Sequence, residues 1–188
     1  MSSARQRRQL DRALRSVDSN PELCLDSVKQ LLADSEPNQQ LLLLRARALK
    51  NLGKSVAAAE QLQQLLADDP GNQEVALEAL ECHLRNIDYA AIKTLLPGLI
   101  EDIPTHQGAL VLCIRAAQAL RQSDQALRLC QALVERAPGN SVHRCKLGTL
   151  YQSFGMMDEA EQAFLGTLES DRDYQPAWYF LAPVSYTH

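Results

Sequence analysis

Asp-Pro-Gly-Asn at residues 69–72 is matched by Ala-Pro-Gly-Asn at residues 137–140, and Pro104 lies midway between. Pro70, Pro104 and Pro138 are therefore 34 residues apart, and each follows an apolar stretch. Such a joint ends a helix, because proline fixes φ and lacks an amide donor, while glycine and asparagine tolerate left-handed backbone geometry. An interval of 34 residues is typical of a two-helix repeat array.

The 34-residue frame can be tested at every column. It predicts the units 5–38, 39–72, 73–106, 107–140 and 141–174, with a partial sixth at 175–182. The twentieth column holds small or aliphatic residues, which are Cys24, Ala58, Ile92, Ala126 and Ala160. Apolar residues recur at three- and four-residue intervals, as in amphipathic helices, and no strand-like alternation is present. The sequence therefore predicts an all-α class, with these columns facing inward.

Each predicted unit contains two helices and a turn between them. Gly53 and Gly155 both occupy the fifteenth column, where a residue with positive φ ends the first helix. The other units have Ser19, Ile87 and Arg121 in that column. We expect those three turns to close by other means.

Composition narrows the class of protein. The chain is 46% hydrophobic and 22% charged, which is typical of a folded protein. Its net charge of −4 argues against a nucleic-acid binder, because neutralising phosphates needs a dense basic face. The basic run consists of Arg5, Arg7, Arg8, Arg12 and Arg15. Such a run could contact an acidic partner or lipid headgroups; the alternative is a solvated first helix that caps the array.

No segment predicts secretion or membrane insertion. The N-terminal arginines are not followed by an apolar run, and no window approaches the roughly 20 apolar residues of a membrane span. We therefore expect no membrane span and a cytoplasmic location.

No motif for catalysis, cofactor binding or metal binding is present. The five cysteines have no C-x-x-C spacing; Cys24, Cys113 and Cys130 fall in inward columns, and Cys145 on the side expected to face a groove. His83 falls in an inward column and is expected to be a hydrogen-bonded core residue. The sequence therefore predicts no enzyme, no cofactor and no metal site.

The fifth unit resembles the tetratricopeptide repeat (TPR) family. The resemblance rests on Leu147-Gly148, Tyr151, Gly155, Ala160, Phe164 and Leu168, which follow the order of large and small residues in that family. It implies a right-handed α-solenoid of stacked antiparallel helix pairs, a single domain over 1–182 with about five repeats and a partial sixth. From Pro183 the pattern breaks, so 183–188 is expected to be an irregular or truncated tail.

The resemblance also implies a concave groove, lined by the first helix of each unit, that receives a peptide or a partner segment. The predicted groove residues are Arg47, Lys50, Asn51, Arg85, Arg115, Gln118, Lys146 and Gln152. The same columns also supply Glu78, Glu81 and Thr149. Because five of these residues are cationic in an acidic chain, we hypothesise that the groove prefers acidic or carboxylate-terminated segments. The alternative is that they are ordinary solvated charges.

Two functions are consistent with the sequence. The first is a non-catalytic scaffold for protein–protein interaction, with a protein or peptide partner and an oligomeric state that the sequence leaves open. The second is the N-terminal TPR region of a larger bacterial enzyme, such as a TPR-containing sulfotransferase, with its catalytic domain beyond His188. The chain itself has no nucleotide-sulfate-binding loop.

Overall fold

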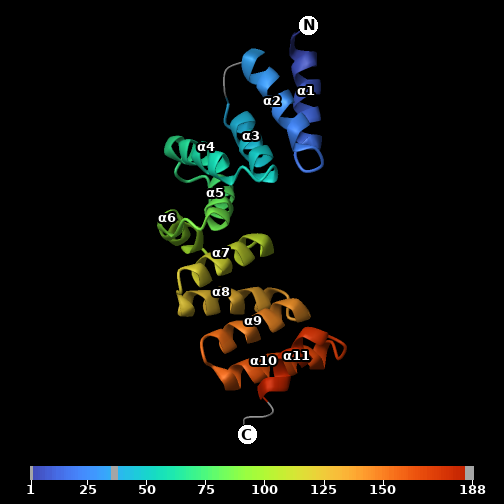
Figure 1. Ribbon diagram of the computed structural model, residues 1–188, viewed down its shortest axis with the longest axis vertical. Coiled ribbons are helices and arrows are strands. Elements are labelled where there is room, and N and C mark those ends of the chain that lie inside the picture. Colours follow the sequence, from blue (N-terminus) through green and yellow to red (C-terminus); the bar gives the residue numbers. More distant parts are fainter. Residues whose placement is uncertain (1, 35–37, 185–188) are drawn as a thin grey trace. The chain divides into compact units, whose positions relative to one another are not determined.

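The computed structural model describes residues 2–34 and 38–184, and within them the chain forms eleven α-helices and no strand (Figure 1). The predicted all-α class is confirmed. The helices are α1 (Ser2–Ser16), α2 (Pro21–Asp34), α3 (Gln39–Asn51), α4 (Ser55–Asp68), α5 (Gln73–Asn86), α6 (Tyr89–Ile100), α7 (Gln107–Ala119), α8 (Ser123–Arg136), α9 (Ser141–Ser153), α10 (Met157–Ser170) and α11 (Gln175–Val184).

The chain divides into two compact units, Met1–Leu95 and Leu96–His188. In the first unit each helix from α1 to α5 packs on the next, and α3 also contacts α5. In the second unit the same serial packing runs from α7 to α11, and α9 also contacts α11. Serial stacking has a physical reason, because one helix pair alone cannot bury both of its faces. A single solenoid over 1–182 stays a prediction.

The joints between repeats form one column of helix N-caps. Asn38, Asn72 and Asn140 each accept a hydrogen bond through the side chain from a backbone amide of the helix that follows. His106 fills the same column and accepts from the amide of Gly108. The asparagine of the Pro-Gly-Asn joint thus satisfies an amide that would otherwise lack a partner. Each of these four residues therefore fixes where a first helix begins.

The turns inside the repeats also share one conformation. Gly53 and Gly155 have φ of 75° and 78°, as predicted, but Ile87 and Arg121 have φ of 57° and 56° in the same column. The expectation that these two turns close by other means is therefore wrong. The helix pair requires the left-handed conformation at this column, and it imposes that conformation even on residues with a Cβ, at a cost of about 1 kcal/mol or more.

The inward columns are buried as predicted. Every residue of the twentieth column is fully buried, including the larger Ile92. Cys24 belongs to the core cluster of α1, α2 and α3, in which Ala13 and Val28 are also fully buried. The first repeat therefore forms a packed helix pair, although the opposite face of α1 is strongly basic.

The second unit has a core around Phe164 of α10. Its ring stacks on Phe180 of α11 with centroids 5.3 Å apart, and a Cβ added to Gly148 of α9 would lie 2.5 Å from the ring. The Leu147-Gly148 pair is thus explained by the close approach of an aromatic ring. Cys145 belongs to this cluster and is 5% exposed, so the expectation that it faces a groove is wrong. It is buried because α10 and α11 both supply residues to the cluster around it.

The buried position predicted for His83 is confirmed, but its predicted hydrogen bond is not found. The side chain is nearly buried, and Nδ1 lies 3.1 Å from Oδ2 of Asp88 without the alignment of a hydrogen bond. His83 and Asp88 thus form a close contact beside the turn between α5 and α6.

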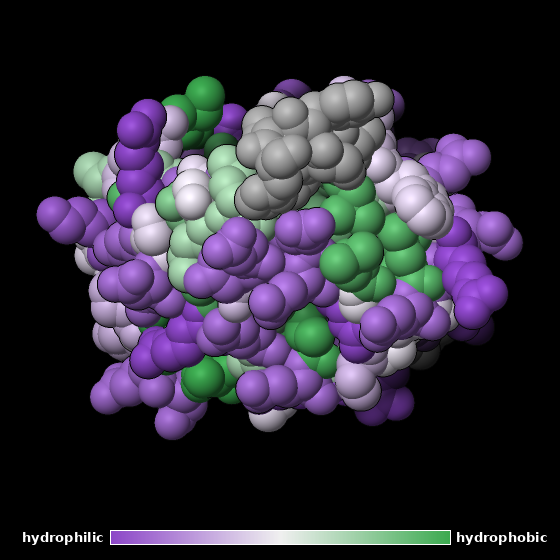
Figure 2. Space-filling model, turned by 90° about the horizontal axis from the view of Figure 1, so that it is seen from below, coloured by the Kyte–Doolittle hydropathy of each residue, from purple (hydrophilic) through white to green (hydrophobic). Residues whose placement is uncertain are grey.

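The last described helix, α11, carries both buried and exposed apolar residues. Leu181 is buried, whereas Trp178 and Tyr179 are 58% and 76% exposed. The face seen from below is mostly hydrophilic, with hydrophobic side chains in separate areas (Figure 2).

Helix α11 continues to Val184, so the first two residues of the expected tail 183–188 are helical, and the other four lie outside the described residues. A proline close to a helix end removes only one late hydrogen bond.

None of the helices in the described part of the chain is long and apolar enough to cross a membrane.

Candidate partner-binding surfaces

The predicted groove residues of the first unit form an ion-pair network between α3 and α5. The guanidinium of Arg47 donates to Glu78 at 2.9 Å and to Glu74 at 2.6 Å. The ammonium of Lys50 donates to Glu78 and Glu81, both at 2.5 Å. Two cations of α3 therefore lie against three carboxylates of α5.

The ion pairs of the network shift the pKa values of Lys50 and Glu81. Burial lowers the pKa of Lys50, but hydrogen bonds and charges from Glu78 and Glu81 outweigh it, so its pKa is raised above the usual value. Burial raises the pKa of Glu81, but Lys50 and Arg85 outweigh it, so that pKa is lowered. Both shifts favour the charged forms of Lys50 and Glu81.

The other two predicted groove residues of this unit also have partners within the protein. Arg85 donates to Glu81 at 2.7 Å, and the Asn51 amide donates to the Val17 carbonyl at 2.9 Å and to Asp18 at 3.1 Å. Asn51 thereby ties α3 to the turn between α1 and α2. A hollow of about 260 Å³ here is lined by Arg47, Lys50, Asn51, Glu78, Val17 and Asp18. Its charges balance internally.

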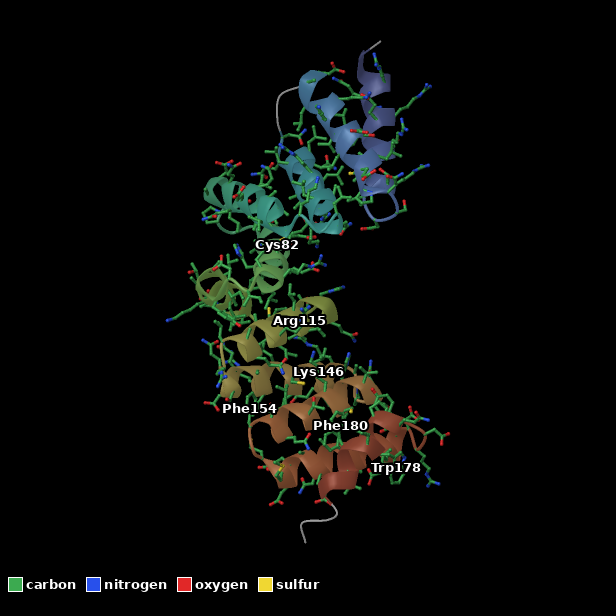
Figure 3. The ribbon with its side chains drawn as sticks, viewed as in Figure 1. Cys82, Arg115, Lys146, Phe154, Trp178 and Phe180 are labelled. Atoms are coloured by element: carbon green, nitrogen blue, oxygen red, sulfur yellow. The ribbon has the colours of Figure 1, made fainter. Side chains whose placement is uncertain are left out.

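The predicted groove residues of the second unit lie on α7 and α9. Arg115 and Gln118 are exposed on α7, and Lys146 and Gln152 are half-buried on α9. Figure 3 shows Arg115 and Lys146 on these two helices. No ion pair within the described part of the chain includes Arg115 or Lys146. These two cations therefore differ from those of the first unit.

The protonation of Lys146 reflects this lack of a carboxylate. Burial lowers its pKa; the nearby Cys130 acts in the opposite direction, and the positive charge of Arg115 lowers the pKa further. The net shift is downward, whereas the net shift of Lys50 is upward. The environment of Lys146 in the folded protein therefore disfavours its charged form.

The two faces occupy the same positions of the repeat. Arg47 and Arg115 are separated by two repeats of 34 residues, and so are Glu78 and Lys146. Where the first unit places a carboxylate opposite its arginine, the second unit places an ammonium. The second unit therefore has two cations at positions that form an ion pair in the first.

Comparison with known proteins matches one segment of the chain to a family model. Residues 40–72 match the family model described as tetratricopeptide repeat. This segment of the chain is therefore a tetratricopeptide repeat. No curated protein matches the sequence. The matched segment coincides with the second predicted repeat, which contains α3 and α4.

Solved structures with the TPR fold of this chain include several of MamA. "MamA 41-end from Desulfovibrio magneticus RS-1" superimposes with a TM-score of 0.77 at 19% identity, covering 90% of this chain and 96% of that one. "MamA RS-1 ArsTM double mutant" gives 0.76 at 19% identity, with 89% and 94% covered. A further MamA crystal structure gives 0.75 at 17% identity, with 89% and 92% covered. At these identities the likeness concerns the fold alone.

Reasoning from the TPR columns missed one member of the first face. Glu74 lies in the second column of its repeat, outside the columns expected to line the groove, yet it pairs with Arg47. The spacing of Glu74, Glu78 and Glu81 was an available signal, because residues four and then three apart share one helix face. An acidic stripe one repeat after the basic Arg47 and Lys50 indicates pairing between the two helices.

Proposed function

We propose that this protein is a non-catalytic interaction scaffold that binds an acidic segment of a partner protein on the face of α7 and α9. Arg115 and Lys146 are the residues expected to contact it. The proposal rests on one observation: the position that holds the carboxylate of Glu78 in the first unit holds the ammonium of Lys146 in the second. A carboxylate supplied by the partner would take the place that Glu78 has beside Arg47.

The energetics of Lys146 favour an anionic ligand. A half-buried ammonium next to a guanidinium is costly, because it is partly desolvated and repelled. A carboxylate between the two cations would compensate for the lost hydration and would add an attraction to each cation. Arginine suits this role, since its planar fork of donors matches the two oxygens of a carboxylate.

Neutral side chains beside the cations add hydrogen-bonding capacity. Gln118 and Gln152 fill the twelfth column of consecutive repeats, on α7 and α9. An amide can both donate and accept, so these two residues suit the backbone of an extended peptide. The equivalent residue of α3 is Lys50, which is already engaged with Glu78 and Glu81.

The first unit is a poorer candidate for the same ligand. A partner carboxylate there would compete with Glu74, Glu78 and Glu81, which already neutralise the cations. Of the five cations predicted to line the groove, Arg115 and Lys146 therefore carry the proposal.

The test is a charge reversal with a matched control. A fluorescein-labelled oligoglutamate of about ten residues, roughly 15 Å long as a helix, serves as the probe in a fluorescence anisotropy titration. We expect Lys146→Glu to weaken binding by about tenfold or more, since it removes an attraction and adds a repulsion. Lys93→Glu, on an exposed lysine of α6, should change the affinity less than about twofold. Equal losses in the two variants, or none in either, would refute the proposal.

No observation favours the alternative of an enzyme-associated TPR region. The structural matches reported above are to MamA. The scaffold is therefore the function we propose.

A further inference from the structure

The positive charge of the first unit is concentrated on α1. Residues 1–16 contain five arginines and one aspartate, whereas residues 17–95 contain seven basic and twelve acidic side chains. The first helix is therefore a basic element within an otherwise acidic unit.

Four of these arginines share one face of α1. Arg5, Arg8, Arg12 and Arg15 are spaced three, four and three residues apart, so they form a stripe about 15 Å long. All four are exposed, and none belongs to an ion pair within the described part of the chain. Like charges at this spacing destabilise a helix, so the stripe has no stabilising role in the fold.

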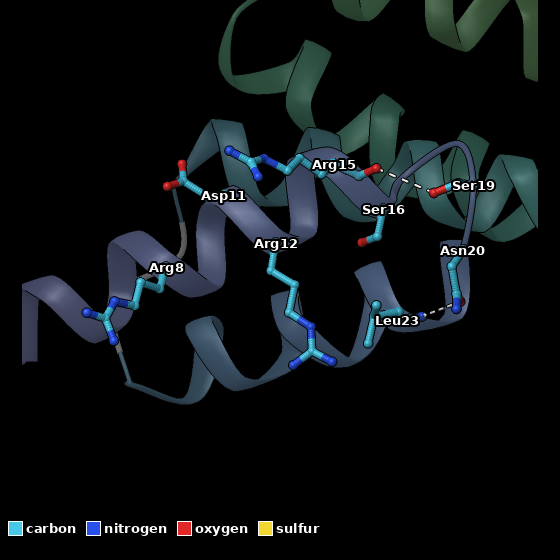
Figure 4. A pocket seen from close by; sticks show the side chains of 8 residues that line it. All are labelled: Arg8, Asp11, Arg12, Arg15, Ser16, Ser19, Asn20 and Leu23. Atoms are coloured by element: carbon cyan, nitrogen blue, oxygen red, sulfur yellow. Dashed lines mark hydrogen bonds between the residues drawn. The ribbon is translucent and has the colours of Figure 1, made fainter.

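The stripe borders a hollow between α1 and the start of α2. The hollow has a volume of about 470 Å³, and Arg8, Arg12 and Arg15 line it together with Ser16 and Asn20 (Figure 4). Asn20 caps α2, accepting from the amide of Leu23 at 3.1 Å. The positive end of the α2 dipole therefore reinforces the arginines.

We propose that this arginine face of α1 is a second docking surface, which binds an acidic segment of a partner protein independently of Arg115 and Lys146. The face combines a row of guanidinium groups with a concave, hydrogen-bonding floor. A short acidic segment can place its carboxylates along the row, with each arginine donating two hydrogen bonds.

A lipid surface fits this face less well. A helix that lies in a membrane interface buries its apolar side, but Leu10 and Ala13 of α1 already pack in the core with α2 and α3. Leu14 is exposed to 44%, and it is a single apolar residue beside the stripe.

A long nucleic acid is also disfavoured. A polyanion that extends past α1 would meet the acidic remainder of the unit, within the screening length of roughly 10 Å. A short acidic peptide would contact the stripe alone. The charge distribution therefore favours a protein segment.

The experiment uses the full chain carrying Lys146→Glu, so that the site on α7 and α9 does not contribute. In this background we expect labelled oligoglutamate still to bind, but about tenfold or more weakly than it binds the unchanged chain, because the α1 face is the weaker of the two sites. We expect Arg8→Gln/Arg12→Gln/Arg15→Gln to weaken the remaining binding by about a further tenfold. The control Arg45→Gln/Lys54→Gln/Lys93→Gln removes the same number of positive charges from exposed positions of the first unit, and it should change the affinity less than about twofold.

Three results would overturn the inference. The first is that oligoglutamate does not bind in the Lys146→Glu background. The second is that the control triple loses as much affinity as the α1 triple, since the effect would then reflect net charge. The third is that phosphatidylserine vesicles or duplex DNA bind more tightly than oligoglutamate and depend on the same arginines. The second and third results leave the proposal for Arg115 and Lys146 untouched, because those variants are compared within one background. The first result would instead assign all of the binding to the site on α7 and α9, so it overturns the inference about α1 without overturning the proposed function.

Discussion

The α3–α5 face and the α7–α9 face occupy the same repeat columns but differ in charge. On the first, Arg47 and Lys50 are neutralised by carboxylates of the next repeat. On the second, Arg115 is next to Lys146, whose pKa is lowered by burial and by that arginine. The difference shows that the TPR fold fixes which side chains come into contact. The charges in each column decide whether that contact stabilises the protein or leaves a site for a ligand.

The largest effect is expected when the first face is given the charge pattern of the second. Glu78→Lys would place a third cation beside Arg47 and Lys50 in a partly buried position. We expect it to lower the free energy of unfolding by about 3 kcal/mol or more, measured by urea denaturation. Glu60→Lys, on an exposed glutamate of α4, is the matched control and should change it by less than about 0.5 kcal/mol. Similar losses in both would contradict the comparison.

The same substitution at two lysines should have opposite signs. Lys50→Met leaves Glu78 and Glu81 without their shared cation, so we expect a loss of about 2 kcal/mol in the free energy of unfolding. Lys146→Met removes a half-buried charge that has no carboxylate, so we expect a gain of up to about 1 kcal/mol. Urea denaturation of both variants checks the pair. Destabilisation of equal size at the two positions would show that Lys146 is paired after all.

Acid should loosen the first face more than the second. Because the pKa of folded Glu81 is lowered, its contribution to stability is complete above its ordinary pKa and is lost as the pH falls through the folded value. The pKa of Lys50 is raised, so its contribution is complete below its ordinary pKa and is lost only in strong base.

Amide hydrogen exchange at pH 7 and at about pH 3 would test this, after correction for the intrinsic rates. We expect protection to fall in α3 and α5 by more than in α7 and α9, because the described residues form no such carboxylate network on the second face. A uniform loss across the four helices would argue against a local network.

Much of the fold followed from column positions, because helix pairing imposes the same requirement in every repeat. The burial of Cys24, Ile92 and Ala126 was predicted from register alone, and so were the positive φ angles of Gly53 and Gly155. The positive φ angles of Ile87 and Arg121 were not predicted, because these residue types suggested a different turn. The stacking of the helices imposes the left-handed conformation on them nevertheless.

The candidate site was predicted less well, because pairing depends on neighbouring repeats. The groove columns correctly pointed to the helices that meet, but a list of cations does not show which of them are neutralised. The partners of Arg47 lie on α5, in the next repeat, and one of them is in a column not expected to face the groove. Cys145 was misplaced for a similar reason, since α11 contributes to the core around it.

The smallest effect concerns the turns, which are alike in the two units and so serve as an internal standard. Ile87→Gly and Arg121→Gly would relieve the left-handed strain at two equivalent positions. We expect each to raise the free energy of unfolding by about 0.5–1 kcal/mol, less than the full strain because glycine is also freer in the unfolded chain. Thermal melting measures both. A clear difference between the two would mean that the units respond differently to a backbone change, which would weaken the charge-based comparison.

The pKa of Lys146 in the free and bound protein tests the central claim most directly. The lysine side chains would be titrated by NMR with and without saturating oligoglutamate. The signal of Lys146 is identified as the one that is missing from the spectrum of Lys146→Met. We expect the pKa of Lys146 to be lowered in the free protein and to rise when the peptide binds, because a carboxylate beside Arg115 stabilises the ammonium. If the peptide binds and the pKa of Lys146 does not change, the carboxylate lies elsewhere and the account is contradicted.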